Sequence, residues 1–187
     1  GANCYGIDPA PEAINYIKSQ GMTAEVAGFS NLNIFDKKFD FVMLNNVLEH
    51  LREPEKTLND IFALLKKDGI VMIDVPNEFN DFQMAGRDVH NLNDWWVAPP
   101  GHLNYFSGSS LSSLLSSIGF QVEVMESSFP LEMFLLMGEN YVSDGSLGKI
   151  IHNKRVSFES NLRNLGYTDK LHDFYEALAK INLGRQV

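Results

Sequence analysis

The sequence predicts an α/β fold built on a doubly wound, mainly parallel sheet. The runs 39–44 and 70–76 are almost wholly apolar, which is typical of strands that a parallel sheet covers on both faces. Between them, residues 54–67 carry apolar side chains at helical spacing. The stretch 39–76 therefore has the order strand, helix, strand, and we expect a right-handed parallel crossover.

The segments before this unit show the same alternation of strand and helix. Residues 4–8 form a β-prone run, and the prolines that follow suit the first turn of a helix, where no amide hydrogen bond is lost. Apolar residues on one face, with a glycine just beyond the end, predict a short amphipathic helix over 11–20. A weaker strand follows at 23–27.

The second half of the chain departs from this alternation. Residues 77–107 are predicted to be irregular, and a connection of that length usually carries function. The further elements that the pattern predicts are a helix at 109–117, a strand at 120–124, and helices at roughly 131–142, 154–164 and 169–181. We interpret 1–187 as one domain, with an incomplete α/β core to residue 127, a helical cap or insertion over 128–183, and the start of a last strand at 184–187.

Composition narrows the class of protein. With 187 residues, of which 44% are hydrophobic, the chain is long enough to close one globular core. The net charge of −9 should repel a polyanion, so nucleic acid is not the expected substrate. The single cysteine cannot form an internal disulfide, and no apolar run suits a membrane span or a secretory leader. We expect a soluble, cytoplasmic protein.

Polar residues that follow the predicted strands are the first candidates for binding, because ligands of doubly wound sheets lie beyond the carboxyl ends of the strands. Asp8 ends the first strand, where a carboxylate can accept hydrogen bonds from both hydroxyls of a ribose; the alternative is that it caps the next helix. The segment Gly28-Phe29-Ser30 follows the weaker strand. Asn45 and Asn46 interrupt an apolar run, either to face a cofactor or substrate or to form a turn with side-chain hydrogen bonds.

His102 is the candidate general base, because a histidine in the irregular region can take a proton from a substrate hydroxyl at neutral pH. Tyr105 is the second catalytic candidate. The alternative for His102 is an anchor that holds the loop through a backbone carbonyl. Glu49 and His50 are not expected to form an acid–base pair, because adjacent positions on a helical turn point apart. His50 is instead interpreted as a local cap or a histidine at the edge of the core.

Other chemistries find no support in the sequence. His90, His152 and His172 lack the spacing of paired ligands, so no metal site is expected. There is no serine or cysteine in a nucleophile elbow and no phosphate-binding Gly-x-x-x-x-Gly-Lys loop. Hydrolase and nucleoside-triphosphatase functions are therefore not favoured.

Several short motifs occur in a recognisable order. They are Tyr5-Gly6-Ile7-Asp8-Pro9, Phe39-Asp40-Phe41-Val42, Val47-Leu48-Glu49-His50-Leu51 with Pro54, Leu65-Lys66-Lys67-Asp68-Gly69, Val75-Pro76-Asn77, His102-Leu103-Asn104-Tyr105-Phe106-Ser107 and Ile118-Gly119-Phe120. As an ordered set over residues 4–124, they resemble the class I S-adenosylmethionine-dependent methyltransferases. The branch that they resemble most is that of the ubiquinone-pathway O-methyltransferases and of sugar and other small-molecule methyltransferases.

The resemblance implies a Rossmann-like fold and S-adenosylmethionine as cofactor. It also implies a first strand and a glycine-rich loop before residue 1, which this chain is expected to lack. The sheet edges that such a gap exposes favour pairing with another chain, and a homodimer could fill it. The residues that the resemblance assigns to the cofactor are Asp8 for the ribose, Gly28 and Phe29 for the adenine, and Asn45 and Asn46 for the methionine end, and Pro9 is also expected to contact the cofactor.

The function that the resemblance implies is methyl transfer to an oxygen, carbon or nitrogen of a small molecule, with positioning as the main contribution of the protein. His102 or Tyr105 would assist if the acceptor is a hydroxyl, and Trp95, Trp96 and the helices after residue 130 would wall the pocket. Two alternatives stay open. One is a non-catalytic methyltransferase-like module, and the other is an NAD-dependent oxidoreductase, since dinucleotide-binding folds also place an acid after a strand.

Overall fold

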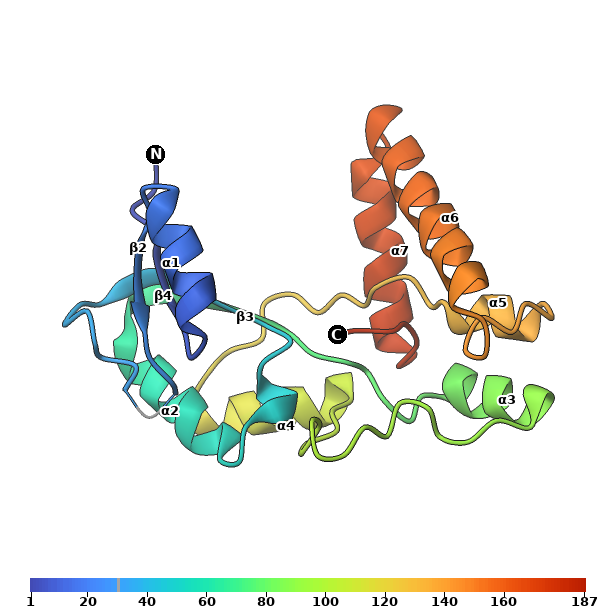
Figure 1. The fold of residues 1–187 in the computed structure, drawn as a ribbon, viewed down its shortest axis with the longest axis horizontal. Coiled ribbons are helices and arrows are strands. Elements are labelled where there is room, and N and C mark those ends of the chain that lie inside the picture. Colours follow the sequence, from blue (N-terminus) through green and yellow to red (C-terminus); the bar gives the residue numbers. More distant parts are fainter. Residues whose placement is uncertain (30) are drawn as a thin grey trace. The chain divides into compact units, whose positions relative to one another are not determined.

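The computed structural model of the chain describes residues 1–29 and 31–187 (Figure 1). These residues form two compact units. Unit 1 comprises residues 1–42 and 55–71, and unit 2 comprises residues 43–54 and 72–187. The chain crosses from one unit to the other after residues 42, 54 and 71. The first and last of these points lie inside strands, and the second lies at the start of the helix that connects those strands.

Unit 1 holds a parallel pair of strands joined by a helix. Strand β1 (Tyr5–Asp8) pairs with β2 (Thr23–Val26), and α1 (Pro11–Ser19) connects them. A proline occupies the first turn of α1, and Ile14 on its inner face is buried. The strand, helix and strand predicted for this part of the chain are therefore confirmed, with small differences at their ends.

The second strand pair is β3 (Phe39–Asn45) and β4 (Leu65–Asp74), with α2 (Pro54–Leu64) between them in sequence. The helix predicted here ends too late, and the strand predicted after it begins too late. Lys66 lies next to β3, since its ammonium is 2.8 Å from the carboxylate of Asp40. The chain already runs beside β3 at a residue that the sequence pattern assigns to the helix.

Strands β3 and β4 run parallel, as predicted. Toward the beginning of both, the carbonyl oxygen of Phe39 approaches Gly69, where an added Cβ would lie 3.1 Å from it. At their ends, the amide of Asn46 donates to the carbonyl of Asp74 at 2.8 Å. Residue numbers rise together along the two strands, which defines parallel pairing. With the parallel pair in unit 1, this confirms the predicted α/β class.

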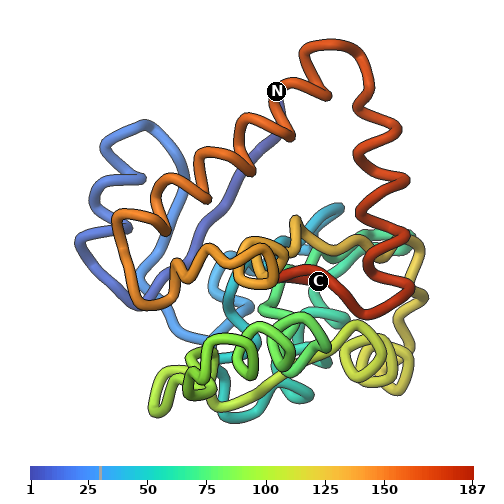
Figure 2. The backbone as a smooth tube through the Cα atoms, turned by 90° about the vertical axis from the view of Figure 1, so that its right-hand side faces the viewer, coloured from blue at the N-terminus to red at the C-terminus, as the bar shows by residue number. Residues whose placement is uncertain are grey.

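Unit 2 contains the ends of β3 and β4 and most of the helices. These are the 3-10 helix η1 (Leu48–His50) and the α-helices α3 (Asp81–His90), α4 (Gly108–Ile118), α5 (Glu132–Leu136), α6 (Gly145–Asn164) and α7 (Thr168–Lys180). Helices α6 and α7 contact each other, and Figure 2 shows the turn that joins them. A buried cluster of Leu171, Tyr175, Leu178 and Leu183 packs at α7. None of the described helices combines the length and the apolar character needed to cross a membrane.

Helix α3 lies in a region that was predicted to be irregular. It begins with a capping box, in which the side chain of Asn80 accepts hydrogen bonds from the amides of Phe82 and Gln83. The side chain of Gln83 accepts from the amide of Asn80 in return. An asparagine three residues before a glutamine is a recognised start signal, so the sequence does contain the evidence for this helix.

The strand predicted at 120–124 is wrong, because no strand is present there in the described structure. The amide of Phe120 donates back to the carbonyl of Leu115, and the amide of Ser127 donates to Tyr175 on α7. A strand needs a neighbour that satisfies its backbone groups, and the apolar pattern of the segment cannot supply one.

Helix boundaries between residues 131 and 164 also differ from the prediction. The first helix is cut short, because the chain turns at Gly138 with a φ of 93°. Helix α6 begins earlier than predicted. The carboxylate of Asp144 accepts hydrogen bonds from the amides of Ser146 and Leu147 and so caps the helix at that point.

The last residues of the chain pair with the segment that follows β4. Val75 and Val187 exchange two backbone hydrogen bonds, of 3.0 and 2.9 Å. The bridge between Pro76 and Gln186 is antiparallel. This pairing brings the C-terminal side chains to the polar ends of β3 and β4.

Candidate functional site

The carboxyl ends of β1 and β2 lie together at one edge of unit 1. The amide of Ala27, just after β2, donates to the carbonyl of Asp8 at 3.2 Å. Gly28 and Phe29, both half-buried, therefore follow at the edge where Asp8 ends β1. Ser30, which the sequence groups with them, lies outside the described residues.

Asp8 uses one carboxylate oxygen locally. Its Oδ1 atom accepts a hydrogen bond from the amide of Ala10 at 2.7 Å, across the exposed Pro9. This resembles the capping alternative, although α1 itself starts without a side-chain cap. No further hydrogen bond reaches the Asp8 carboxylate among the described residues, so Oδ2 remains an acceptor for a ligand.

The ends of β3 and β4 form a second polar edge, in unit 2. Asn45 and Asn46 are exposed there, and Nδ2 of Asn46 donates to Oδ1 of Asn45 at 2.7 Å, as in the turn considered as their alternative. Nε2 of Gln186 donates to Oδ1 of Asn46 at 3.1 Å and to Oδ2 of Asp74 at 3.3 Å. Asp74 and Gln186 were not predicted from the sequence, because their contact depends on the pairing of segments that are far apart in the chain.

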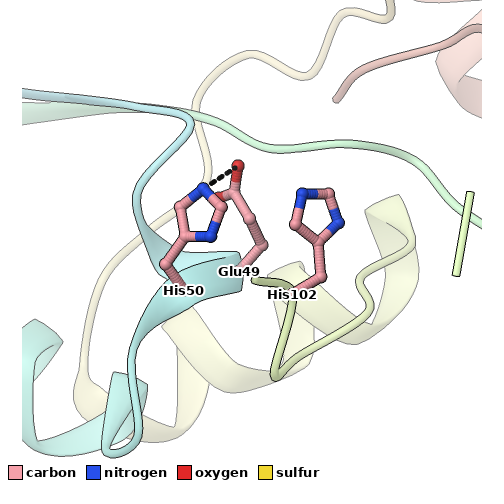
Figure 3. Close-up of side chains that lie close together, drawn as sticks. All are labelled: Glu49, His50 and His102. Carbon is pink, nitrogen blue, oxygen red and sulfur yellow. Dashed lines mark ion pairs between the residues drawn. The ribbon is translucent and has the colours of Figure 1, made fainter. Parts of the chain in front are cut away.

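Glu49, His50 and His102 form a compact cluster in unit 2. One ligand atom from each lies within 4.8 Å of the other two, and the imidazole rings of His50 and His102 pack edge-on with their centroids 5.1 Å apart. Figure 3 shows the three side chains close together and marks the ion pair of His50 with Glu49. Glu49 is 1% exposed, and its Oε2 atom has no hydrogen-bond partner among the described residues. Burial raises the pKa of nearby Asp74, and the carboxylate of Glu49 raises it further.

The prediction that Glu49 and His50 point apart is wrong. Nε2 of His50 lies 3.6 Å from Oε1 of Glu49, and Nδ1 lies 2.8 Å from the carbonyl oxygen of Gly101. Because a carbonyl only accepts, Nδ1 carries the hydrogen of that bond. The two residues belong to a 3-10 turn, and the contact with Gly101 fixes the ring beside Glu49. The spacing rule for a regular α-helix does not describe this arrangement.

The loop that carries His102 is fastened to η1 by hydrogen bonds that do not involve the histidine ring. The amides of Leu103 and Asn104 both donate to the carbonyl of Glu49, at 2.7 and 3.0 Å. Nδ2 of Asn104 donates to two more backbone carbonyls of the η1 turn, at 3.1 and 2.6 Å. These bonds hold His102 beside the buried carboxylate.

The ring of His102 contacts a second carboxylate, which the sequence analysis did not single out. Nδ1 of His102 lies 3.2 Å from Oε1 of Glu78, a residue that is 6% exposed. Burial raises the pKa of Glu78, and the neighbouring His102 acts in the opposite direction. The contact with a loop carbonyl that was considered for His102 is made by His50.

Tyr105 belongs to a row of aromatic rings. Its centroid lies 6.3 Å from that of His102 and 5.6 Å from that of Phe79. Phe79 packs edge-on against Trp96, which packs in the same way against Trp95. Nε1 of Trp96 is buried with no hydrogen-bond partner among the described residues. The expectation that the two tryptophans wall a substrate pocket stays a prediction.

The side chain of Glu132 lies close to those of two other polar residues, Arg185 and Tyr141. Glu132 is fully buried, and its Oε1 atom lies 3.7 Å from Nη1 of Arg185. Burial raises the pKa of Glu132, and it also raises that of the Tyr141 hydroxyl, while the neighbouring Arg185 acts in the opposite direction on both. No motif or spacing in the sequence connects these three residues.

These sites differ in what they can do. The edge at Asp8 offers a charged acceptor, whereas the cluster at His102 offers carboxylate and imidazole groups, which are the side chains that most often act as general acids and bases. Carboxylate and imidazole also bind divalent cations, so Glu49, His50 and His102 are the group among the described residues that could hold one. The expectation of no metal site stays a prediction.

Comparison with known proteins gives matches over most of the chain. A family profile described as a methyltransferase domain matches residues 1–124. An uncharacterised protein of Methanocaldococcus jannaschii is 29% identical over 116 residues, which cover 62% of this chain and 55% of that protein. A tRNA U34 carboxymethyltransferase of Aliarcobacter butzleri is 31% identical over 75 residues, which cover 37% of this chain and 25% of that protein. A probable S-adenosylmethionine-dependent methyltransferase of Mycolicibacterium smegmatis is 24% identical over 120 residues, which cover 63% and 43%.

The chain thus spans about half, or less, of the length of the curated relatives that it matches. Among solved structures, a SAM-dependent methyltransferase from Archaeoglobus fulgidus matches 97% of this chain and 72% of its own, with a TM-score of 0.52 and 16% identity. A chain of the complex between the Haloferax volcanii Trm112 methyltransferase activator and a methyltransferase matches 67% and 53%, with a TM-score of 0.51 and 18% identity. At such identities these likenesses concern the fold alone, and they confirm the predicted Rossmann-like α/β class.

Proposed function

The chain belongs to the methyltransferase domain family, and from this membership we propose that the protein transfers a methyl group from S-adenosylmethionine to an oxygen, carbon or nitrogen atom of a small molecule. The observation that carries the proposal is the match of the family profile to residues 1–124, which include Asp8, Asn46 and His102. The choice of methyl donor is supported by the name of the similar protein from M. smegmatis, a probable S-adenosylmethionine-dependent methyltransferase.

The residues present fit S-adenosylmethionine. Its ribose offers two hydroxyl donors, and Asp8 retains a carboxylate oxygen that can accept from them. Gly28, at the same edge, leaves room for a ligand, since an added Cβ would meet no atom of the described residues within 4 Å. When bound, the donor supplies a methyl group on a positively charged sulfur. The assignments of Phe29 to the adenine and of Asn45 and Asn46 to the methionine end stay predictions.

On the acceptor side, we assign His102 as the base when the methylated atom is a hydroxyl oxygen, with Tyr105 as the second candidate. The assignment is supported by the fixed position of the His102 loop on η1 and by the contact of the ring with Glu78. Both features favour a ring that is held in one orientation before the acceptor binds. Holding the reacting groups in place is the main contribution expected of the protein.

A small molecule is favoured over nucleic acid as the acceptor, because a net charge of −9 opposes the approach of a polyanion. One relative is nevertheless named as a tRNA U34 carboxymethyltransferase. RNA is therefore the second acceptor class to test. The homodimer expected from exposed sheet edges likewise stays a prediction, and sedimentation of the purified chain would decide it.

The test is incubation of the purified protein with methyl-labelled S-adenosylmethionine and a cell extract that is then separated into small molecules, RNA and protein. Label in the small-molecule fraction is the expected result. Label in RNA alone would show that the acceptor is RNA and not a small molecule. Tight binding of S-adenosylmethionine without transfer to any fraction would favour a non-catalytic module. Thermal stabilisation by NADH but not by S-adenosylmethionine would favour the oxidoreductase and sink the proposal.

A further inference from the structure

The backbone on either side of Glu78 is held by hydrogen bonds to distant segments. The amide of Glu78 donates to the carbonyl of Phe106 at 3.1 Å, and the amide of Asn77 donates to the carbonyl of Arg185 at 2.9 Å. The side chain of Asn77 also donates to the carbonyl of Gly184 at 3.1 Å. Glu78 is therefore fixed relative to the segment that carries His102, which is the condition for one side chain to orient another.

The contact between the two side chains determines which ring nitrogen carries a hydrogen. Nδ1 of His102 lies 3.2 Å from Oε1 of Glu78. An ionised carboxylate only accepts, so Nδ1 must be the donor, and the neutral ring then keeps its lone pair on Nε2. A protonated Glu78 would reverse this order, since its hydroxyl would donate to Nδ1 and leave the hydrogen on Nε2. The tautomer of His102 therefore shows whether its Nδ1 atom donates a hydrogen bond to Glu78 or accepts one from it.

The burial of Glu78 is unfavourable if its only role is packing. Its Oε2 atom is buried with no hydrogen-bond partner among the described residues. A carboxylate in that position loses hydration without full compensation, and an apolar side chain of similar size would stabilise the fold better. The other charges near it, Arg185 and Glu49, shift its pKa in opposite directions. The presence of a carboxylate at this unfavourable position therefore indicates that Glu78 has a role for which its acceptor oxygen is needed.

We propose that Glu78 is a positioning residue, which holds the His102 ring with Nδ1–H toward its carboxylate and so presents Nε2 to the hydroxyl of the methyl acceptor. This inference rests on the proposed function, in which His102 is the base. The acceptor O–H bond breaks and its proton passes to Nε2. The acceptor oxygen forms the new bond to the methyl carbon, while the bond between that carbon and sulfur breaks and leaves its electron pair on sulfur.

The first experiment is nitrogen NMR of the protein with labelled histidine at neutral pH, without donor or acceptor, with His102→Gln to assign the signal. We expect the hydrogen of His102 on Nδ1 in the wild type and a mixed or reversed tautomer in Glu78→Gln. The matched control is Glu126→Gln, because Oε1 of Glu126 lies 2.7 Å from Nδ1 of His172 at the surface. This variant should alter the His172 signal only. An unchanged His102 tautomer in Glu78→Gln overturns the proposal.

The second experiment measures transfer to a hydroxyl acceptor. Glu78→Gln should lower kcat by about 10- to 100-fold, the loss typical when the carboxylate partner of a metal-binding histidine is removed, with little change in the KM of the donor. Glu78→Asp should restore part of the loss, and Glu126→Gln should match the wild type. Equal kcat in Glu78→Gln and Glu126→Gln, with both folded by thermal melt, overturns the proposal. If His102→Gln retains full activity, the base assignment fails, whereas the tautomer spectra still test the orientation by Glu78.

Discussion

The carboxylate of Glu132 is fully buried, and its Oε1 atom lies 3.7 Å from Nη1 of Arg185, beyond hydrogen-bond distance. Burial raises the pKa of Glu132 above its ordinary value. The folded protein therefore holds a proton at a pH where the unfolded chain has already released it. The contribution of this group to stability is complete below its unfolded pKa and is lost as the pH rises through its folded pKa.

We predict that Glu132→Gln increases the free energy of unfolding at neutral pH by on the order of 1 kcal/mol, because it removes a buried charge that Arg185 compensates only in part. Urea unfolding from about pH 5 to about pH 8 should show that wild-type stability falls more steeply with pH than that of the variant. Some slope should remain, because the pKa values of Asp74 and Glu78 are also raised. The control is Glu139→Gln, a more exposed partner of Lys154. Equal slopes in the wild type and Glu132→Gln would contradict the prediction.

Gly184 allows the last residues to pass close to the segment at Ser127. Its φ is 107°, and an added Cβ would lie 2.5 Å from both the Cβ of Ser127 and the carbonyl oxygen of Ser128. Gly166 also has a positive φ, of 82°, but in the described part of the chain no atom lies within 4 Å of a Cβ added there. The two glycines therefore share the backbone requirement and differ in the space around them.

We predict that Gly166→Ala costs about 1–2 kcal/mol, which is the typical cost of a left-handed backbone for a residue with a Cβ. Gly184→Ala should cost at least about 1–3 kcal/mol more, because backbone and side chain must shift to admit the methyl group. The free energies come from urea unfolding of both variants. Equal losses would mean that the approach of residue 184 to Ser127 is not maintained in solution.

Much of the fold could be predicted from the sequence because its signals are local. The apolar run that forms β3 and the proline that opens α1 act within a few residues, so strand and helix follow directly. The segment 120–124 has a similar apolar character but lacks a neighbour, and a neighbour is not a local property. Helix α3 was missed for a different reason, since its Asn80 capping signal was present but not applied.

The candidate site was harder to predict than the fold. His102 and Asp8 stand out as residue types at expected positions, whereas Glu78 and Gln186 acquire their roles through contacts with residues that are 24 and 140 positions away. No spacing rule connects such residues. His50 shows a further limit, because one hydrogen bond to Gly101 turns its ring to a neighbour that the helical rule placed elsewhere.

Asn104 provides a test of how the His102 loop is anchored. Its Nδ2 atom donates to the carbonyls of Leu48 and Leu51, and Asn104→Ala leaves both without this donor. The carbonyl of Leu48 still accepts from the amide of Leu51, whereas that of Leu51 loses its side-chain donor. We predict a loss of about 1–3 kcal/mol in the free energy of unfolding, the typical cost of leaving a partly buried acceptor unpaired, and a lower kcat. The control is Asn161→Ala, at an exposed position of α6. A stability within error of the wild type would show that other contacts fix the loop.

The contribution of Asp8 to donor binding can be separated from its local hydrogen bond. Asp8→Asn keeps an oxygen that can accept from the amide of Ala10 but loses the charge, whereas Asp8→Ala loses both. We predict that both variants weaken S-adenosylmethionine binding by about tenfold or more, because a hydrogen bond to a charged acceptor contributes about 1.5–3 kcal/mol. Only Asp8→Ala should also lower the melting temperature of the ligand-free protein.

Calorimetric titration with S-adenosylmethionine and melting curves without it measure the two effects independently, and Glu12→Gln at the exposed first turn of α1 controls for a change in charge near the site. If Asp8→Asn binds the donor as tightly as the wild type while Asp8→Ala melts earlier, Asp8 is a turn residue and the ribose assignment is lost. If both variants bind weakly and Asp8→Asn melts normally, the sugar requires the charge itself, because loss of the carboxylate is the one change that the two variants share.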